Sequence, residues 1–171
     1  GGAVQNNSGN VTIQGSSYFT TNNATKLGGA IYNAAAGTVN LIGTTIFGNN
    51  SDIAQKNTAI TGGAIYNLGN LNLTGNTSFY NNSATTDFGG AIYTSGPTTI
   101  SGTNIFSGNT ATISGGAIYS TVALSISGNA IFENNIVAGN GVETNGGGAI
   151  NARSNLTITG TRTGDIAVPV V

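Results

Sequence analysis

The chain returns repeatedly to the stretch Gly62-Gly63-Ala64-Ile65-Tyr66-Asn67. Further copies of this stretch begin at Gly1, Gly28, Gly89, Gly115 and Gly147. The first copy has Val4 in place of the isoleucine, and the last has Asn151 in place of the tyrosine. A motif that recurs along a chain is typical of repeat proteins, in which each repeat is one structural unit and neighbouring units stack.

Two further blocks follow each Gly-Gly-Ala motif. One alternates apolar and polar residues and ends in glycine, as in Leu71-Asn72-Leu73-Thr74-Gly75. The other is a phenylalanine with an asparagine three residues later. The phenylalanines are Phe19, Phe47, Phe79, Phe106 and Phe132, and the asparagines are Asn22, Asn50, Asn82, Asn109 and Asn135. We expect each set to stack, with the asparagines joined as an amide ladder.

These blocks predict an all-β fold. Alternation with a period of two residues, together with glycine and asparagine turns, is typical of short strands. No apolar stripe with helical spacing is present, and glycine, asparagine and β-branched residues are poor helix formers. The pattern predicts a parallel β-helix, or solenoid, of about six coils with about three short strands in each. We expect residues 1–171 to form one such solenoid.

The spacing between blocks predicts where the loops lie. The distance from each Gly-Gly-Ala to its phenylalanine hardly varies, whereas the distance from phenylalanine to the next Gly-Gly-Ala does. Insertions at one place in a repeat indicate loops on one edge of a solenoid. We expect these loops at residues 51–61 and 136–146. The last coil, residues 147–171, is degenerate because Gly164 occupies the phenylalanine position.

The alternation also predicts which side chains face the core. Adjacent coils lie about 4.8 Å apart, so equivalent residues form rows. One inward row is expected to hold Ile31, Ile65, Ile92, Ile118 and Ile150. Each tyrosine follows its isoleucine directly and therefore points outward, in a column of Tyr32, Tyr66, Tyr93 and Tyr119. This column is a candidate stripe for binding carbohydrate or protein, or else it only stabilises the coil.

The composition argues against several classes of function. Charged residues make up 5% of the chain and the net charge is −1, so nothing favours binding to nucleic acid. No apolar run approaches the roughly 20 residues that span a bilayer, so we expect no direct membrane insertion of this segment. The chain has no His and no Cys, which excludes the usual catalytic triads and thiolate metal sites. We expect no catalytic residue, no cofactor and no metal.

An enzyme remains an alternative because many polysaccharide-active enzymes are β-helices. Their chemistry needs clustered carboxylates and often a bound cation. Asp52, Asp87 and Glu143 could share the edge that carries the insertions. We interpret them as solvated loop residues. An ice-binding face is a further alternative, but the outward row of Thr, Ser and Asn is too mixed to favour it.

The alternation of Gly-Gly-Ala-Ile with Phe-x-x-Asn resembles the chlamydial polymorphic membrane proteins and the autotransporter passengers built on similar repeats. The resemblance covers Gly1 to about Gly160. It implies a right-handed β-helix displayed outside the cell, on the bacterial surface, with an adhesive role. The expected function is therefore a non-enzymatic adhesin or stalk whose receptor is a protein or a glycan on another surface.

The first and last repeats leave a second hypothesis open, in which the chain associates with copies of itself. The sequence starts on the first residue of a repeat and carries no polar cap. Open strand edges invite pairing with another chain. The chain is then either a fragment excised from a longer passenger or the protomer of a fibre that associates head to tail.

Overall fold

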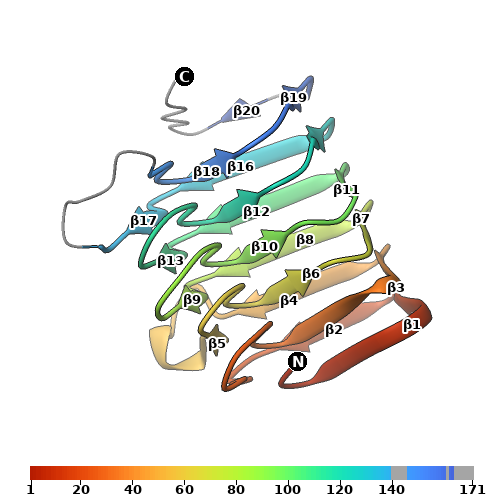
Figure 1. Ribbon diagram of the computed structural model, residues 1–171, viewed down its shortest axis with the longest axis horizontal. Helices are drawn as coiled ribbons and strands as arrows, with labels where there is room; N and C mark the ends of the chain where they lie inside the picture. The colour runs from red at the N-terminus through yellow and green to blue at the C-terminus, as the bar shows by residue number, and fades with distance from the viewer. Residues whose placement is uncertain (140–145, 161, 164–171) are drawn as a thin grey trace.

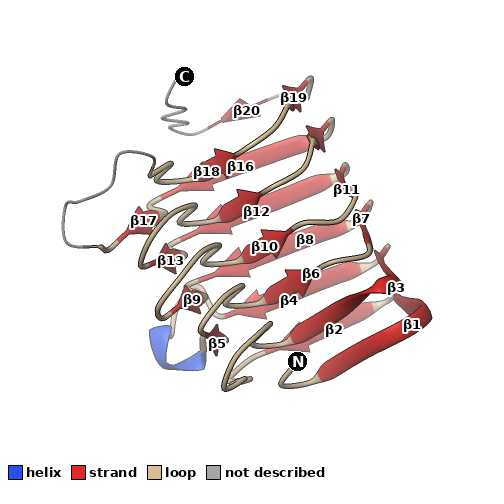
Figure 2. Ribbon diagram, viewed as in Figure 1, coloured by secondary structure: helices blue, strands red, loops and turns tan. Residues whose placement is uncertain are grey.

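The computed structural model describes residues 1–139, 146–160 and 162–163. The described chain is almost entirely β-strand, and its single helical segment is the short 3-10 helix η1 (Ile53–Gln55) (Figure 2). The strands are parallel and form three sheets that run along the molecule (Figure 1). Parts of the predicted loop at 136–146 and of the predicted last coil 147–171 lie outside the described residues.

The first sheet is built from the Gly-Gly-Ala block and the alternating block. In the first two repeats these blocks form the long strands β1 (Val4–Ile13) and β3 (Ile31–Leu41). Later repeats divide them in two, as in β6 (Ile65–Asn67) and β7 (Asn70–Leu73). Beyond β3 the sheet continues as two rows of strands: β10 (Ile92–Thr94), β14 (Ile118–Ser120) and β18 (Ile150–Ala152) follow β6, which pairs with the first half of β3, and β11 (Thr98–Ile100), β15 (Leu124–Ile126) and β19 (Leu156–Ile158) follow β7, which pairs with its second half.

The second sheet is built from the phenylalanine block. Its strands, in spatial order, are β2 (Ser16–Phe19), β4 (Thr44–Gly48), β8 (Asn76–Tyr80), β12 (Thr103–Ser107), β16 (Asn129–Glu133) and β20 (Arg162–Thr163). Spatial order equals chain order, so each repeat lies directly on the one before it. This is the stacking that the repeated sequence predicts.

The third sheet was missed in the sequence. It contains the two-residue strands β5 (Thr58–Ala59), β9 (Ser83–Ala84), β13 (Thr110–Ala111) and β17 (Ile136–Val137). Each of these strands directly follows an asparagine and adds a strand to its repeat, so the prediction of three strands per coil was incomplete. Two residues are too few to show alternation within one repeat. The signal lies in the buried alanines Ala59, Ala84 and Ala111, which recur at one place.

The register sets identical residues side by side. Ile65 pairs with Ile31 and Ile92, and Phe79 pairs with Phe47 and Phe106. Because side chains alternate between the faces of a strand, this register buries the isoleucines and phenylalanines in continuous rows. Ile31, Ile65, Ile92 and Ile118 have no exposed surface, and Ile150 is 2% exposed.

The paired glycines allow the corner before each isoleucine. Gly62 has a φ of 64°, in the left-handed region that favours glycine. Gly63 lies against the backbone of the next repeat, where an added Cβ would collide with the carbonyl oxygen of Gly90. One glycine therefore serves the turn and the other serves the close approach of neighbouring repeats.

The first insertion lies earlier in its repeat than the predicted loop at 51–61. The chain leaves the sheet after Gly48, which has a φ of 82°, and passes through η1. Asp52 caps η1 by accepting a hydrogen bond of 2.9 Å from the Ala54 N–H. Regular structure resumes at Asn57, so the last part of the predicted loop belongs to the third sheet.

Candidate functional site

The phenylalanine column comprises Phe19, Phe47, Phe79, Phe106 and Phe132. Neighbouring ring centroids lie 4.7–4.9 Å apart, and no two neighbouring planes differ by more than 12°. Phe47, Phe79 and Phe106 have no exposed surface. The rings thus lie one on another through the core of the described chain, and Phe19 at the end of the column is only partly buried.

The asparagine column runs beside the phenylalanines. Its members are Asn22, Asn57, Asn82, Asn109 and Asn135. The side-chain amide of each member donates to the side-chain oxygen of the next, over 2.8–3.0 Å. From Asn57 onward each amide also donates to the backbone carbonyl of the phenylalanine in the preceding repeat, as Asn82 does to Phe47.

Asn57 occupies the place that the sequence assigns to Asn50. Asn50 is exposed and follows Gly48 into the excursion, whereas Asn57 has no exposed surface. The spacing of three residues after phenylalanine fails in this repeat because the insertion falls before the asparagine.

A second polar column was not predicted. It comprises Asn6, Asn33, Asn67, Thr94 and Ser120, one residue after each outward position of the tyrosine block. Asn33 donates to the Asn67 oxygen over 2.7 Å, and Asn67 donates to the Thr94 hydroxyl over 2.9 Å. These side chains are buried; Asn6 and Asn33 lie within the continuous strands β1 and β3, whereas Asn67, Thr94 and Ser120 end β6, β10 and β14. The signal in the sequence was a polar residue at this inward position in each of the first five repeats; the sixth has Ala152 there.

The tyrosine column lies on the outside of the first sheet. Neighbouring centroids are 5.7 Å apart for Tyr32 and Tyr66, 4.7 Å for Tyr66 and Tyr93, and 5.7 Å for Tyr93 and Tyr119. Tyr32, Tyr66 and Tyr93 are partly exposed. Tyr119 is 8% exposed and also contacts Phe88, at a centroid distance of 4.4 Å.

The stacking limits what this column can bind. A sugar ring packs on the face of an aromatic ring, and a face already covered by another tyrosine cannot receive it. Within the column each ring therefore offers its edge and its hydroxyl, which can exchange hydrogen bonds with a ligand. Tyr32 differs, because its neighbour in register on the other side is Gln5.

The environment raises the pKa of two of these tyrosines. For Tyr66 the main cause is burial, followed by the neighbouring phenols of Tyr93 and Tyr32. Burial also raises the pKa of Tyr93, and the phenol of Tyr119 adds to it. Both side chains therefore hold their protons more firmly than a free tyrosine does.

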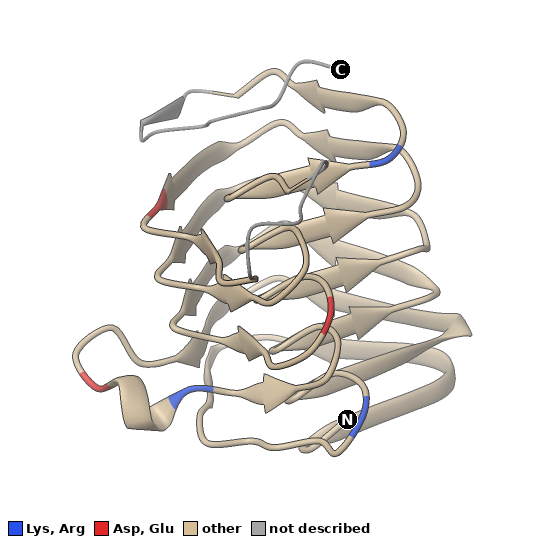
Figure 3. Cartoon of the chain, turned by 60° about the vertical axis from the view of Figure 1, so that its left-hand side comes forward, with Lys and Arg blue, Asp and Glu red and all other residues tan. Residues whose placement is uncertain are grey.

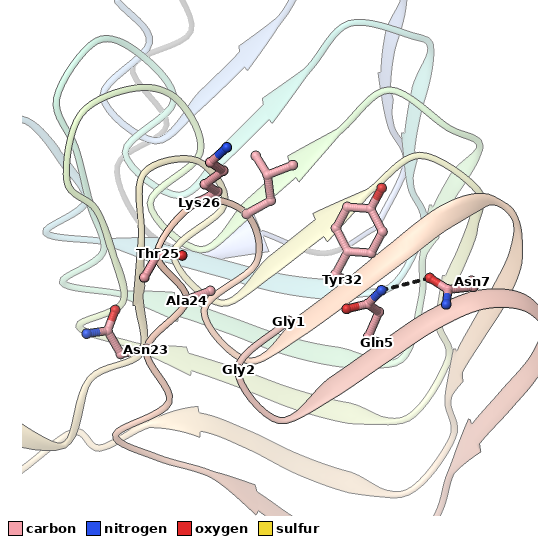
Figure 4. Close-up of a pocket in the computed structure, with 10 residues that line it drawn as sticks. Gly1, Gly2, Gln5, Asn7, Asn23, Ala24, Thr25, Lys26 and Tyr32 are labelled. Carbon is pink, nitrogen blue, oxygen red and sulfur yellow. Dashed lines mark hydrogen bonds between the residues drawn. The ribbon is translucent and has the colours of Figure 1, made fainter.

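A pocket of about 640 Å³ opens beside Tyr32 (Figure 4). Gln5 lines it and donates to Asn7 over 2.9 Å, and Lys26 and Asn23 lie on the side away from Tyr32. The lining is polar apart from Tyr32, Leu27 and small residues. It offers amide groups and the Lys26 ammonium, which suit a polar ligand better than an apolar one.

The charged residues are scattered (Figure 3). Asp52 caps η1, and Asp87 accepts a hydrogen bond of 2.9 Å from the Thr61 hydroxyl. Glu143 lies outside the described residues. Across residues 1–139, 146–160 and 162–163, no three His, Cys, Asp or Glu side chains gather in a group that could hold a metal ion. In the same ranges no helix is long and apolar enough to span a membrane.

Comparison with known proteins identifies a family that has this repeat. The family model of the Chlamydia polymorphic membrane protein repeat matches residues 16–34, 74–95 and 105–121. Each matched segment runs from a Phe-x-x-Asn motif to the following Gly-Gly-Ala-Ile-Tyr motif. No curated protein and no solved structure matches the chain. This chain thus carries the Chlamydia polymorphic membrane protein repeat at three places, on an all-β fold of parallel strands.

Proposed function

We propose that this chain is a non-enzymatic part of a bacterial cell-surface protein and acts as an adhesin or as a stalk, like an autotransporter passenger. The observation that carries the proposal is the match of the polymorphic membrane protein repeat to three stacked segments of the fold. We include in it that residues 1–171 form one right-handed solenoid of about six coils.

The architecture suits a stalk. Each repeat adds about 4.8 Å of length to a rod, so length grows in proportion to the number of repeats. Stacked phenylalanines and hydrogen-bonded asparagines join neighbouring repeats from the first to the fifth. Because such rows are internal, the outer faces are free to vary without loss of the fold.

The surface offers two places for a receptor. One is the row of tyrosine edges and hydroxyls on the first sheet. The other is the excursion around η1, where Ile53 is 67% exposed. Both carry groups that a protein or a glycan receptor can contact, and neither is needed for the internal rows.

The test has two parts. Antibodies against the chain are expected to label intact, unpermeabilised cells of the source bacterium, and labelling only after permeabilisation would contradict a surface location. Beads coated with the chain are then expected to attach to cultured host cells more than albumin-coated beads do. Pretreating the cells with protease or with glycosidases distinguishes a protein receptor from a glycan.

Variants sharpen the adhesion assay. Ile53→Asp and Tyr32→Ser alter the two candidate contact regions, whereas Thr99→Ser on the alternating block is the matched control. Attachment that falls for either contact variant but not for Thr99→Ser supports an adhesin. Attachment equal to that of albumin-coated beads for the unaltered chain rejects the adhesin and leaves the stalk.

A second candidate function is a fibre protomer that associates head to tail. The observation in its favour is the outer edge of β1, which pairs only with β3 within the described residues. A preceding repeat of a longer chain would pair with that edge in the same way. Filaments in electron micrographs of the purified chain would support the fibre, and a monomer at high concentration by light scattering would reject it.

A further inference from the structure

We propose that Tyr66 and Tyr93 form an oxidative cross-linking site, at which a peroxide and a haem peroxidase join the two phenols as dityrosine. The cross-link would tie β6 to β10, which belong to neighbouring repeats. The proposal concerns the outward column only and is independent of any receptor.

The geometry singles out this pair. Tyr66 and Tyr93 are partners in register on adjacent parallel strands. Their ring centroids are 4.7 Å apart and their planes differ by 5°, whereas the other two pairs of the column are 5.7 Å apart. Phenols that the backbone holds side by side need no diffusion to meet, which favours coupling within one molecule.

Exposure favours the same pair. Tyr66 and Tyr93 are both partly exposed, so a small oxidant or a peroxidase-generated radical can reach their hydroxyls. Tyr119 is 8% exposed and contacts Phe88, which shields the end of the column. Tyr18 is 70% exposed, but it lies on the second sheet, where its register partner is Ile46.

The reaction balances without any group from the protein besides the two phenols. Each phenol loses one electron and one proton and becomes a tyrosyl radical. The radicals form a carbon–carbon bond between ring carbons next to the hydroxyls, after the rings turn about their Cβ–Cγ bonds. Each coupled carbon gives up its hydrogen as a proton, and each oxygen regains one. The pair has then lost two hydrogen atoms, which reduce one hydrogen peroxide to two waters.

The product would act as a staple between repeats. A covalent link between Tyr66 and Tyr93 closes a loop in the unfolded chain and lowers its entropy, as a disulfide does. The chain has no cysteine, so it can form no disulfide of its own. We therefore expect the cross-linked protein to unfold at a higher urea concentration than the untreated protein.

The experiment uses the purified chain with hydrogen peroxide and a haem peroxidase. Dityrosine fluorescence is read on the monomeric fraction after size separation under denaturing conditions. Cleavage before Asp52 and Asp87 places Tyr66 and Tyr93 in different peptides. Mass spectrometry should find these peptides joined, with the mass of the sum less two hydrogen atoms, and fragmentation should map the link to Tyr66 and Tyr93.

Substitutions decide the outcome. Tyr66→Phe and Tyr93→Phe keep the stacked rings and should each remove most of the fluorescence of the monomer. Tyr18→Phe and Tyr80→Phe are matched controls and should leave it unchanged. The proposal is overturned if fluorescence of the monomer survives Tyr66→Phe. It is also overturned if dityrosine arises only between molecules, or if none forms while free tyrosine in the same mixture couples.

Discussion

The phenylalanine column and the tyrosine column share one geometry in two environments. Ring centroids are 4.7–4.9 Å apart inside and 4.7–5.7 Å apart outside. The in-register pairing of parallel strands imposes both stacks, because equivalent residues of adjacent repeats must lie side by side. Phe47, Phe79 and Phe106 are fully buried, whereas Tyr32, Tyr66 and Tyr93 are partly exposed. Register therefore explains the stacking, and burial decides how much each column stabilises the fold.

The largest expected effect is in the inner column. Phe79→Ala removes a fully buried ring from between Phe47 and Phe106 and leaves a cavity. We expect the free energy of unfolding to fall by about 3–5 kcal/mol. Urea denaturation followed by circular dichroism measures it. A loss no larger than that of Tyr66→Ala would contradict the statement that burial decides how much each column stabilises the fold.

The asparagine column should rank second. Asn57→Ala removes the acceptor of Asn22 and the donor to Asn82, both inside the amide column. Each buried polar group left without a partner costs about 1–3 kcal/mol. Asn50→Ala is the matched control, and as an exposed substitution it should stay within about 0.5 kcal/mol. Equal losses in the two variants would contradict the placement of Asn57 in the column.

The outer column should contribute less. Tyr66→Ala removes a partly exposed ring from its contacts with Tyr32 and Tyr93. Aromatic pairs are worth about 0.5–1.5 kcal/mol beyond the area that they bury. Because Tyr66 loses two such pairs and the area that it buries, we expect a loss of at least this size but below that of Phe79→Ala, measured by the same urea titration. Tyr66→Phe keeps the ring and should be nearly neutral, so a large loss for Tyr66→Phe would show that the hydroxyl, and not the stack, is the stabilising group.

The smallest effect is a dependence on pH. The folded state raises the pKa of Tyr66 and Tyr93 above 10, the ordinary value for tyrosine. The unfolded chain therefore releases these protons first, and the folded chain binds more protons at alkaline pH. The free energy of unfolding should then decrease as the pH rises above about 10. The double variant Tyr66→Phe with Tyr93→Phe should show a smaller decrease, and an unchanged pH profile would contradict the shifts.

The alternation of apolar and polar residues was sufficient to predict the fold class and the facing of the isoleucine and tyrosine rows. The family resemblance is confirmed by the matches to the repeat, and the all-β fold of parallel strands is confirmed by the sheets. The inward isoleucines and the outward tyrosines follow from the period of two along a strand. Stacking of equivalent residues follows from repetition alone, because neighbouring copies of one motif pair in the same register.

The asparagine that joins the amide column after the first insertion could not be predicted from alternation. Asn50 and Asn57 both follow Phe47, and the spacing rule selects the nearer one. Only the backbone shows that the excursion leaves at Gly48 and returns at Asn57. The position of a loop within a repeat is set by hydrogen bonds to the repeats above and below, which a single repeat does not reveal.

The buried polar residues were also not predicted from the sequence. A rule that assigns inward positions to apolar residues overlooks Asn33 and Asn67, which are fully buried and hydrogen-bonded to each other. Their side-chain hydrogen bond ties β3 to β6 of the next repeat. The sequence was enough to place the tyrosine column on the outer face. That each tyrosine covers the ring face of its neighbour depends on ring orientation, which only the structure gives.

The most direct test measures the spacing of the repeats along the rod. Nitroxide labels are attached through cysteines at Thr12 and, in separate variants, at Thr99, Ser125 or Thr157, which belong to one outward row. Electron-spin distance measurements should give separations from Thr12 that grow by about 4.8 Å at each step along this series. Separations that stay equal, or that shorten along it, would contradict the stacking of the repeats in register.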